Sequence, residues 1–367
     1  MCEGAVRMDK DKGCQEPACG ETCDCGCAGC GTGVSNEESQ FSKEMRAFYE
    51  TGRTAEILSA CTKELTGNPE NSDAYFWRGV VAAVDCNYQE ALADYDKAIE
   101  LTANKASYYS HRGSAYAMLD DIKNAVLDYS KAIFYDPQDW ISYANRGVLY
   151  LNNNMLEHAI DDLSKAIELE PDDMGSYLNR GDAFAARNLF SVAIADYGKV
   201  IERFPEETGA LLKRGQAYYE LGMNDEAMAD YNKILELEPD NVQAIAIRAS
   251  AYLGQGLPDE AVADFTRVIE MDPEDSRPYF FRGIAQAARK AYDEAIGDFT
   301  RSARLDPGNA LAFHNKALCC EIQQRTDEAI EAYRNFLAEA NPESPEARHA
   351  RERLEALDKG SDGSQLQ

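Results

Sequence analysis

The sequence lacks the features of several functional classes. No apolar run among its 367 residues reaches the roughly 18–20 residues that a membrane-spanning helix needs. The stretch from Met1 to Lys12 carries charges where a signal peptide has an apolar core, so we expect a cytoplasmic protein. Basic residues are scarce, with 37 Lys and Arg against 65 Asp and Glu and a net charge of −28. That charge opposes binding to nucleic-acid phosphates and to anionic membranes, and we expect neither as a partner.

The motifs of common enzymes are also missing. The sequence contains no phosphate-binding G-x-x-x-x-G-K-[ST] loop, no dinucleotide fingerprint and no nucleophile elbow. The four histidines are His111, His158, His314 and His349. They show no H-E-x-x-H pairing, and we expect all four on the surface. The sequence therefore predicts a protein that is not an enzyme.

Cysteine is scarce except in the first 30 residues, which hold seven of the eleven. The C-x-C and C-x-x-C spacings there would let neighbouring thiolates reach one soft metal ion, zinc or copper(I). The candidate ligands are Cys19, Cys23, Cys25, Cys27 and Cys30. This pattern resembles metallothionein-type clustering over less than a tenth of the chain. Two alternatives stay open, namely redox or thiol modification and a disordered tail with no fixed role, and apart from this metal we expect no cofactor.

The other four cysteines fall within the regular part of the chain. They are Cys61, Cys86, Cys319 and Cys320. Because small apolar side chains at such places usually pack, we expect all four to be buried.

A period of 34 residues runs through most of the chain. When a unit is counted from Ser72, its position 8 holds a small residue, in the order Gly79, Gly113, Gly147, Gly181, Gly215, Ala249, Gly283 and Ala317. Position 20 is always alanine, from Ala91 to Ala329, and position 24 holds a ring or leucine, from Tyr95 to Tyr333. Positions 4, 8 and 11 share one face of a helix, as do positions 20, 24 and 27. Each unit is therefore predicted to be a helical hairpin, and stacked units bury their faces against one another.

This spacing, with glycine, tyrosine, alanine, a ring and proline at positions 8, 11, 20, 24 and 32, resembles the tetratricopeptide repeat family. The resemblance implies an all-α fold, a right-handed α-solenoid of helix-turn-helix units. We expect a cysteine-rich, disordered tail over 1–35, a degenerate repeat over 36–71 and eight repeats over 72–343. A capping helix over 344–358 and a disordered tail over 359–367 should follow.

Position 7 carries arginine and position 23 aspartate in the first seven units, from Arg78 and Asp94 to Arg282 and Asp298. In the eighth unit Lys316 and Ala332 replace both. Because both residues are replaced together, we predict Arg–Asp pairs. Two alternatives are an arginine stripe for an acidic ligand and pairing of each Asp with the Lys or Arg three residues on.

The family resemblance places a concave groove along positions 2, 5, 9, 12 and 13 of the first helices. Ten groove residues are our candidates for partner binding: Phe76, Met118, Leu151, Leu178, Asp182, Leu212, Gln216, Tyr219, Leu253 and Phe280. No three consecutive units carry the Lys and Asn pattern with which some family members hold a C-terminal carboxylate, so that type of co-chaperone is disfavoured.

Three functional hypotheses remain. The first is a non-enzymatic scaffold or adaptor that binds a segment of a partner protein in the groove, with acidic flanks that steer basic partners. A simpler interpretation of the acidic charge is solubility. The second is a metal- or redox-responsive adaptor that uses the cysteine cluster. The third, an accessory subunit that holds an enzyme assembly together, is indistinguishable from the first by sequence.

Overall fold

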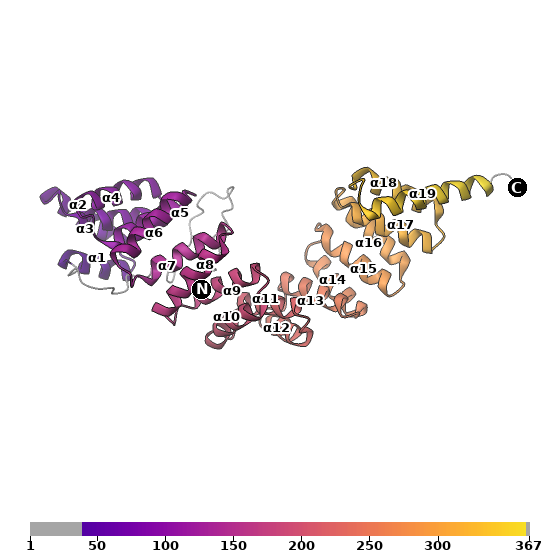
Figure 1. The fold of residues 1–367 in the computed structure, drawn as a ribbon, viewed down its shortest axis with the longest axis horizontal. Coiled ribbons are helices and arrows are strands. Elements are labelled where there is room, and N and C mark those ends of the chain that lie inside the picture. The colour runs from indigo at the N-terminus through magenta and orange to yellow at the C-terminus, as the bar shows by residue number, and fades with distance from the viewer. Residues whose placement is uncertain (1–38, 365–367) are drawn as a thin grey trace. The chain divides into compact units, whose positions relative to one another are not determined.

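The computed structural model describes residues 39–364, which form nineteen helices and no strand. The chain divides into two compact units, Met1–Arg203 and Phe204–Gln367. Within each unit, successive helices form antiparallel hairpins that stack on one another (Figure 1). The predicted fold class, an all-α solenoid of helical hairpins, is confirmed.

The helices of the N-terminal unit are α1 (Gln40–Glu50), α2 (Thr54–Gly67), α3 (Ser72–Val84), α4 (Tyr88–Leu101), α5 (Ala106–Met118), α6 (Ile122–Tyr135), α7 (Trp140–Asn152), α8 (Leu156–Leu169), α9 (Met174–Ala186) and α10 (Phe190–Arg203). The helices of the C-terminal unit are α11 (Thr208–Glu220), α12 (Asn224–Leu237), α13 (Val242–Gly254), α14 (Pro258–Met271), α15 (Ser276–Ala288), α16 (Tyr292–Leu305), α17 (Ala310–Ile322), α18 (Thr326–Glu339) and α19 (Pro345–Ser364).

The 34-residue register sets the helix boundaries. In all eight repeats the first helix covers positions 1–13 and the second covers positions 17–30. Position 34 precedes each following first helix and often caps it, because a side chain there accepts a hydrogen bond from a free backbone N–H. Asp139 accepts from the backbone N–H of Ser142 in this way, and Asn241 from that of Ala244.

The turn inside each hairpin needs a left-handed residue at position 15. Gly222 and Gly256 supply it with φ of +72° and +74°, and Asp120 and Asn154 also adopt positive φ there. Cys86 occupies the same position with φ of +59° and is exposed. The expectation that Cys86 is buried was therefore wrong, because position 15 belongs to the turn and not to a helix face. Cys61, Cys319 and Cys320 are buried, as predicted.

Position 8 is small because the ring at position 24 lies directly against it. A Cβ atom added to Gly181 would stand 2.6 Å from Cε1 of Tyr197, and one added to Gly79 would stand 2.8 Å from Cε1 of Tyr95. Position 20 is equally closed, with Ala91 fully buried. The two helices of a hairpin therefore approach closely, and the ring fills the space between them.

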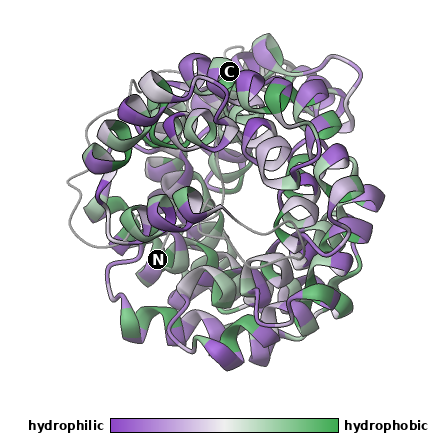
Figure 2. Cartoon of the chain, turned by 90° about the vertical axis from the view of Figure 1, so that its left-hand side faces the viewer, coloured by the Kyte–Doolittle hydropathy of each residue, from purple (hydrophilic) through white to green (hydrophobic). Residues whose placement is uncertain are grey.

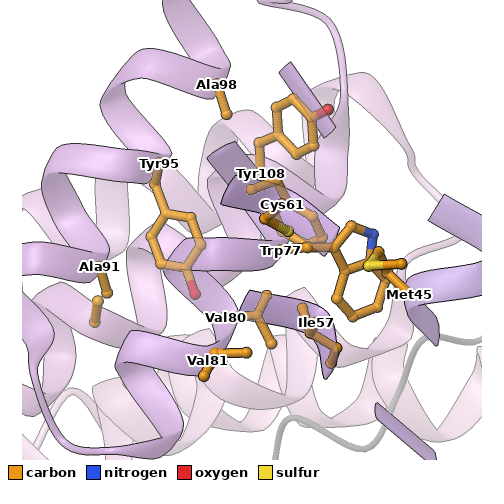
Figure 3. Packing of buried hydrophobic residues seen from close by; sticks show 12 residues of the cluster. Met45, Ile57, Cys61, Trp77, Val80, Val81, Ala91, Tyr95, Ala98 and Tyr108 are labelled. Carbon is orange, nitrogen blue, oxygen red and sulfur yellow. The ribbon is translucent and has the colours of Figure 1, made fainter. Parts of the chain in front are cut away.

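The first core of the N-terminal unit lies where α1 and α2 meet α3. Figure 3 shows Met45, Ile57 and Cys61 gathered around Trp77, whose exposed fraction is 2%. Met45 and Ile57 replace the small residues of a regular repeat, and both are fully buried. The hairpin of α1 and α2 covers an apolar face of α3 that would otherwise meet water.

A buried polar network joins α1, α3 and α5 beside that core. Asp73 on α3 accepts hydrogen bonds from Ser39 Oγ, Lys105 Nζ and Tyr108 Oη, all at 2.5 Å. Burial alone would raise the pKa of Asp73, but these three donors outweigh it and lower that pKa below its ordinary value. The carboxylate therefore stays charged and ties three helices together.

The final helix, α19, covers the last hairpin of the C-terminal unit. Ala347 and Ala350 are fully buried in a cluster with Tyr333 and Phe336 of α18. The sequence predicts a capping helix that ends at 358 and a disordered tail from 359. The helix instead continues to Ser364, because Gly360 lowers helix propensity without stopping a helix as proline would.

The described helices are amphipathic. Hydrophobic and hydrophilic residues alternate around individual helices in Figure 2, as burial of one face in each stack requires. None of the described helices is long and apolar enough to cross a bilayer. The cysteine cluster and its predicted tail over 1–35 lie outside the described residues.

Candidate functional site

Seven arginine side chains each bind one aspartate in the second helix of the same hairpin. In every pair Nε and Nη2 of the arginine donate to the two carboxylate oxygens at 2.6–2.9 Å. The pairs are Arg78–Asp94, Arg112–Asp128, Arg146–Asp162, Arg180–Asp196, Arg214–Asp230, Arg248–Asp264 and Arg282–Asp298. The predicted pairing is confirmed, with the planar fork geometry that makes such pairs strong.

Five of these seven arginines also contact the preceding repeat. Arg112 donates through Nη1 to Asp96 Oδ1 at 2.6 Å, and Arg146 donates through Nη1 to Ser130 Oγ at 2.7 Å. Corresponding bonds join Arg180 to Ser164, Arg248 to Asn232 and Arg282 to Thr266. Each of these residues occupies position 25 of the repeat before, so one guanidinium joins two hairpins. Sequence reasoning missed this contact, although position 25 holds a polar residue in all these units.

Aromatic rings on the same helix flank the guanidinium groups. Arg146 lies 5.9 Å from the ring centroids of Tyr143 and Tyr150, one turn away on either side. Burial lowers the pKa of Arg146, but the bond to Asp162 outweighs burial and raises it. Because carboxylate, hydroxyl and rings occupy the arginines, the structure disfavours the hypothesis that they form a stripe for an acidic ligand. The other alternative pairs an aspartate with the basic residue three positions on. Within residues 39–364 it is seen at Arg267, whose Nη1 lies 3.9 Å from Asp264 Oδ1.

The candidate groove residues of the N-terminal unit differ in accessibility. Met118 is 43% exposed, whereas Leu151 and Leu178 are half-buried. Asp182 is half-buried and accepts a hydrogen bond from Tyr197 Oη at 2.9 Å, so the hydroxyl of the ring at position 24 reaches position 9 of the first helix.

Phe76 is the exception among these candidates. It is 5% exposed and stacks on Tyr108, with ring centroids 4.8 Å apart. Position 3 of the second repeat carries this tyrosine where most other repeats carry Ala or Ser, and the larger ring covers position 5 of the repeat before. The expectation that Phe76 is open to a partner was therefore wrong.

The C-terminal unit presents a similar set of partly covered side chains. Leu212, Leu253 and Phe280 are half-buried on three successive first helices, α11, α13 and α15. Tyr219 is 36% exposed and its hydroxyl lies against Gly254, where an added Cβ would stand 2.3 Å away. Gln216 is exposed and supplies a polar group within the same set. Such partly exposed apolar side chains beside polar ones suit the binding of a protein segment.

The described residues offer little for catalysis or metal binding. They contain no group of three or more His, Cys, Asp or Glu side chains that could hold a metal ion. Burial raises the pKa of Cys61 to about 12 and that of Cys319 to about 11, so both thiols stay protonated.

Two of the four histidines are only partly exposed, where the sequence predicted surface positions. His111 packs its ring against Phe76, with centroids 4.9 Å apart, and His314 packs against Phe336 at the same distance. Burial lowers the pKa of both imidazoles. His158 and His349 are exposed, as expected.

Comparison with protein families gives matches to three models, each described as a tetratricopeptide repeat. One matches residues 178–242 and 248–310, a second matches 140–173 and a third matches 72–105. Together the matched segments cover just over half of the chain. No curated protein matches the sequence.

Solved structures of repeat proteins resemble the fold. The C-terminal part of a TPR repeat-containing protein from Cytophaga hutchinsonii aligns with a TM-score of 0.50 and 21% identity, over 75% of this chain and 98% of that one. A tetratricopeptide repeat protein from Parabacteroides merdae gives a TM-score of 0.46 and 19% identity, over 68% and 100%. YrrB, described as a TPR protein with an unusual peptide-binding site, gives 0.47 and 23%, over 52% and 97%.

Proposed function

Because the chain belongs to the tetratricopeptide repeat family, we propose that it is a non-enzymatic cytoplasmic scaffold that binds a segment of a partner protein. The binding face lies along the first helices of consecutive repeats. The observation that carries this proposal is the set Leu212, Tyr219, Leu253 and Phe280, which are apolar yet only partly covered on α11, α13 and α15. Within a packed repeat such side chains gain most from burial by a second chain.

The charge of the protein suggests the kind of partner. A net charge of −28 attracts basic segments over long range and accelerates their association. A partner segment with basic residues around a few apolar anchors would suit both the groove and its surroundings. Its association rate should fall as ionic strength rises, because salt screens exposed charges beyond about 8–10 Å.

The test begins with a photo-crosslinker placed at Phe280. Crosslinked proteins from the native cell are identified by mass spectrometry, and the recovered segment is synthesised. Its affinity for the wild type and for the Tyr219→Ala, Leu253→Ala double variant is then measured. Loss of two central apolar anchors should weaken binding at least about tenfold, a change of roughly 1.4 kcal/mol.

The matched control is Leu257→Ala, because Leu257 is similarly exposed at 39% but lies in a turn. Its affinity should equal that of the wild type. Equal affinity of the double variant and the wild type would contradict the proposed binding face.

We keep a second proposal for the amino-terminal cysteine cluster, a metal- or redox-responsive role. Its basis is the C-x-C and C-x-x-C spacing among Cys19, Cys23, Cys25, Cys27 and Cys30. Protein purified without oxygen should carry zinc or copper, and serine at the last four of these positions should abolish the metal. Less than about a tenth of an equivalent in the reduced wild type would reject the role.

A further inference from the structure

One helix of the N-terminal unit carries an exposed row of alternating basic and apolar side chains. Lys123, Leu127, Lys131 and Phe134 follow one another along α6 at intervals of four, four and three residues, so they share one side of the helix. Phe134 is 77% exposed and Leu127 is 50% exposed. No other exposed large hydrophobic residue among those described has a higher exposed fraction than Phe134. We call these four residues the α6 stripe.

Other repeats carry a different surface at the same positions. Position 22, held by Leu127, is alanine at Ala93, Ala195, Ala229 and Ala263. Position 29, held by Phe134, is glutamate at Glu100, Glu168, Glu202, Glu236 and Glu270. The first four of these glutamates each form an ion pair at 2.8–3.1 Å with the lysine three residues before. The fold therefore forms without Leu127 and Phe134, and their presence in the second repeat needs another reason.

Neighbouring rings extend the α6 stripe into a packed platform. Phe134 meets Tyr135 edge to face, with centroids 5.3 Å apart and planes at 76°. Tyr135, 40% exposed, stacks on the buried ring of Tyr109 at 5.4 Å and 21°. Lys131 Nζ lies 5.3 Å from the centroid of Tyr109. These contacts hold the exposed rings in place before any partner arrives, which reduces the entropy lost on binding.

The charges of the α6 stripe indicate what covers it. Lys123 and Lys131 form no ion pair within residues 39–364. Lys131 lacks a carboxylate because Phe134 stands where four other repeats place a glutamate that pairs with the lysine three residues before it. A partner with carboxylates beside apolar side chains would supply that missing charge and cover both Leu127 and Phe134.

We propose that the α6 stripe is a docking site for an acidic amphipathic helix of a partner protein. The apolar residues of that helix pack on Leu127 and Phe134, and its Glu or Asp side chains pair with Lys123 and Lys131. This surface is on second-helix positions 18, 22, 26 and 29, whereas the proposed groove uses first-helix positions. The inference therefore goes beyond the proposed scaffold function, and either one can fail alone. Because one helix face is small, we expect a dissociation constant on the order of 10–100 µM.

The test measures fluorescence anisotropy of a labelled 16-residue helical peptide with leucines along one face and glutamates on both sides of it. A control peptide has lysine in place of every glutamate. The acidic peptide should bind the full-length protein, and its affinity should fall as salt rises from about 50 to 300 mM. The basic peptide should bind at least about tenfold more weakly, despite the negative charge of the protein.

The decisive variant combines Leu127→Ala with Phe134→Glu, which gives the second repeat the surface that other repeats carry. The change should leave helical content and melting temperature at or above wild-type values, because it adds a Lys–Glu pair of the kind seen elsewhere. Affinity for the acidic peptide should fall at least about tenfold. The matched control is Glu168→Ala, at the same position of the third repeat, which should bind as the wild type does.

Several outcomes would overturn the proposal. One is equal binding of the acidic peptide to the wild type and the double variant, and another is tighter binding of the basic peptide. No binding of the acidic peptide, together with self-association in sedimentation that the double variant abolishes, would identify a second copy of this chain as the occupant. Flotation of the wild type, but not of the variant, with phosphatidylserine vesicles would identify an anionic membrane instead.

Discussion

Glycine at position 8 is required by the ring that faces it. Alanine at Gly181 would place its Cβ 2.6 Å from Tyr197, and the ring is fixed because it fills the hairpin. Gly198, on α10, has nothing within 4 Å of an added Cβ. The same substitution should therefore have opposite effects at two positions 17 residues apart.

Gly181→Ala should destabilise the protein by about 1–3 kcal/mol, because overpacking outweighs the better helix propensity of alanine. Gly198→Ala should stabilise it by about 0.5–1 kcal/mol, since only the propensity and the entropy of the unfolded chain change. Urea denaturation followed by circular dichroism measures both. Stabilisation by Gly181→Ala would show that the ring can move away.

The Arg–Asp pairs allow a comparison of buried and exposed ion pairs within one molecule. Asp162→Ala leaves Arg146, whose side chain is 16% exposed, without its bidentate partner and should cost about 1–3 kcal/mol. Glu168→Ala breaks an exposed pair, in which the side chain of Glu168 is 69% exposed and that of Lys165 is 38% exposed. Its loss should cost less than about 0.5 kcal/mol. If this is correct, Asp162→Ala has a lower urea midpoint than Glu168→Ala. Equal midpoints would mean that water screens the Arg146 pair as well.

At the scale of helices, the sequence predicted those features that recur along the array. The contact of position 8 with position 24 recurs in all eight repeats and that of position 7 with position 23 in seven, so both could be inferred from spacing. The stacking of Tyr108 on Phe76 occurs in one repeat only. Whether Phe76 is covered depends on the size of the ring at this contact between two hairpins, so it could not be inferred from spacing. Cys86 could have been placed correctly, because Gly222 and Gly256 mark the same turn position.

The packing of α5 on α3 should depend on pH through His111. Burial against Phe76 and Tyr95 lowers the pKa of this imidazole below its ordinary 6.5, although a contact with the Ser107 carbonyl opposes the shift. Below about pH 6.5 the unfolded chain binds a proton at His111 that the folded chain does not bind. The contribution of neutral His111 to stability is therefore fully present above about pH 6.5 and is lost as pH decreases to the folded pKa. Asp73, with its lowered pKa, contributes in the same direction only below about pH 4.

His111→Phe should therefore reduce the loss of stability between about pH 7.5 and 5.5, measured by urea unfolding at both pH values. His314 should leave a residual dependence, because burial also lowers its pKa. His158→Phe is the control, since His158 is exposed. An unchanged pH dependence in His111→Phe would show that folding does not lower the pKa of this imidazole.

At the scale of the whole molecule, a repeat array is stable where each hairpin covers its neighbour. The sequence predicted the eight regular repeats because the same residue types return every 34 positions. Its predictions were weaker at the ends, where Met45 and Ile57 replace the repeat residues and where α19 continues beyond 358. An end hairpin has a neighbour on one side only, so its residues follow the shape of that neighbour and not the repeat pattern.

Two deletions test whether the α1–α2 hairpin, and not the segment before it, completes the N-terminal core. Removal of residues 1–34 leaves Ser39, which donates to Asp73, and the residues that cover Trp77, so helical circular dichroism and melting temperature should stay unchanged. Removal of residues 1–71 uncovers Trp77, now 2% exposed, and deprives it of Met45, Ile57 and Cys61. In a Trp140→Phe background Trp77 is the single tryptophan. Its fluorescence should then shift to the red on the longer deletion, and the melting temperature should fall by several degrees, because an apolar face of α3 meets water. A lower melting temperature on the shorter deletion would instead assign part of the stability to residues 1–34.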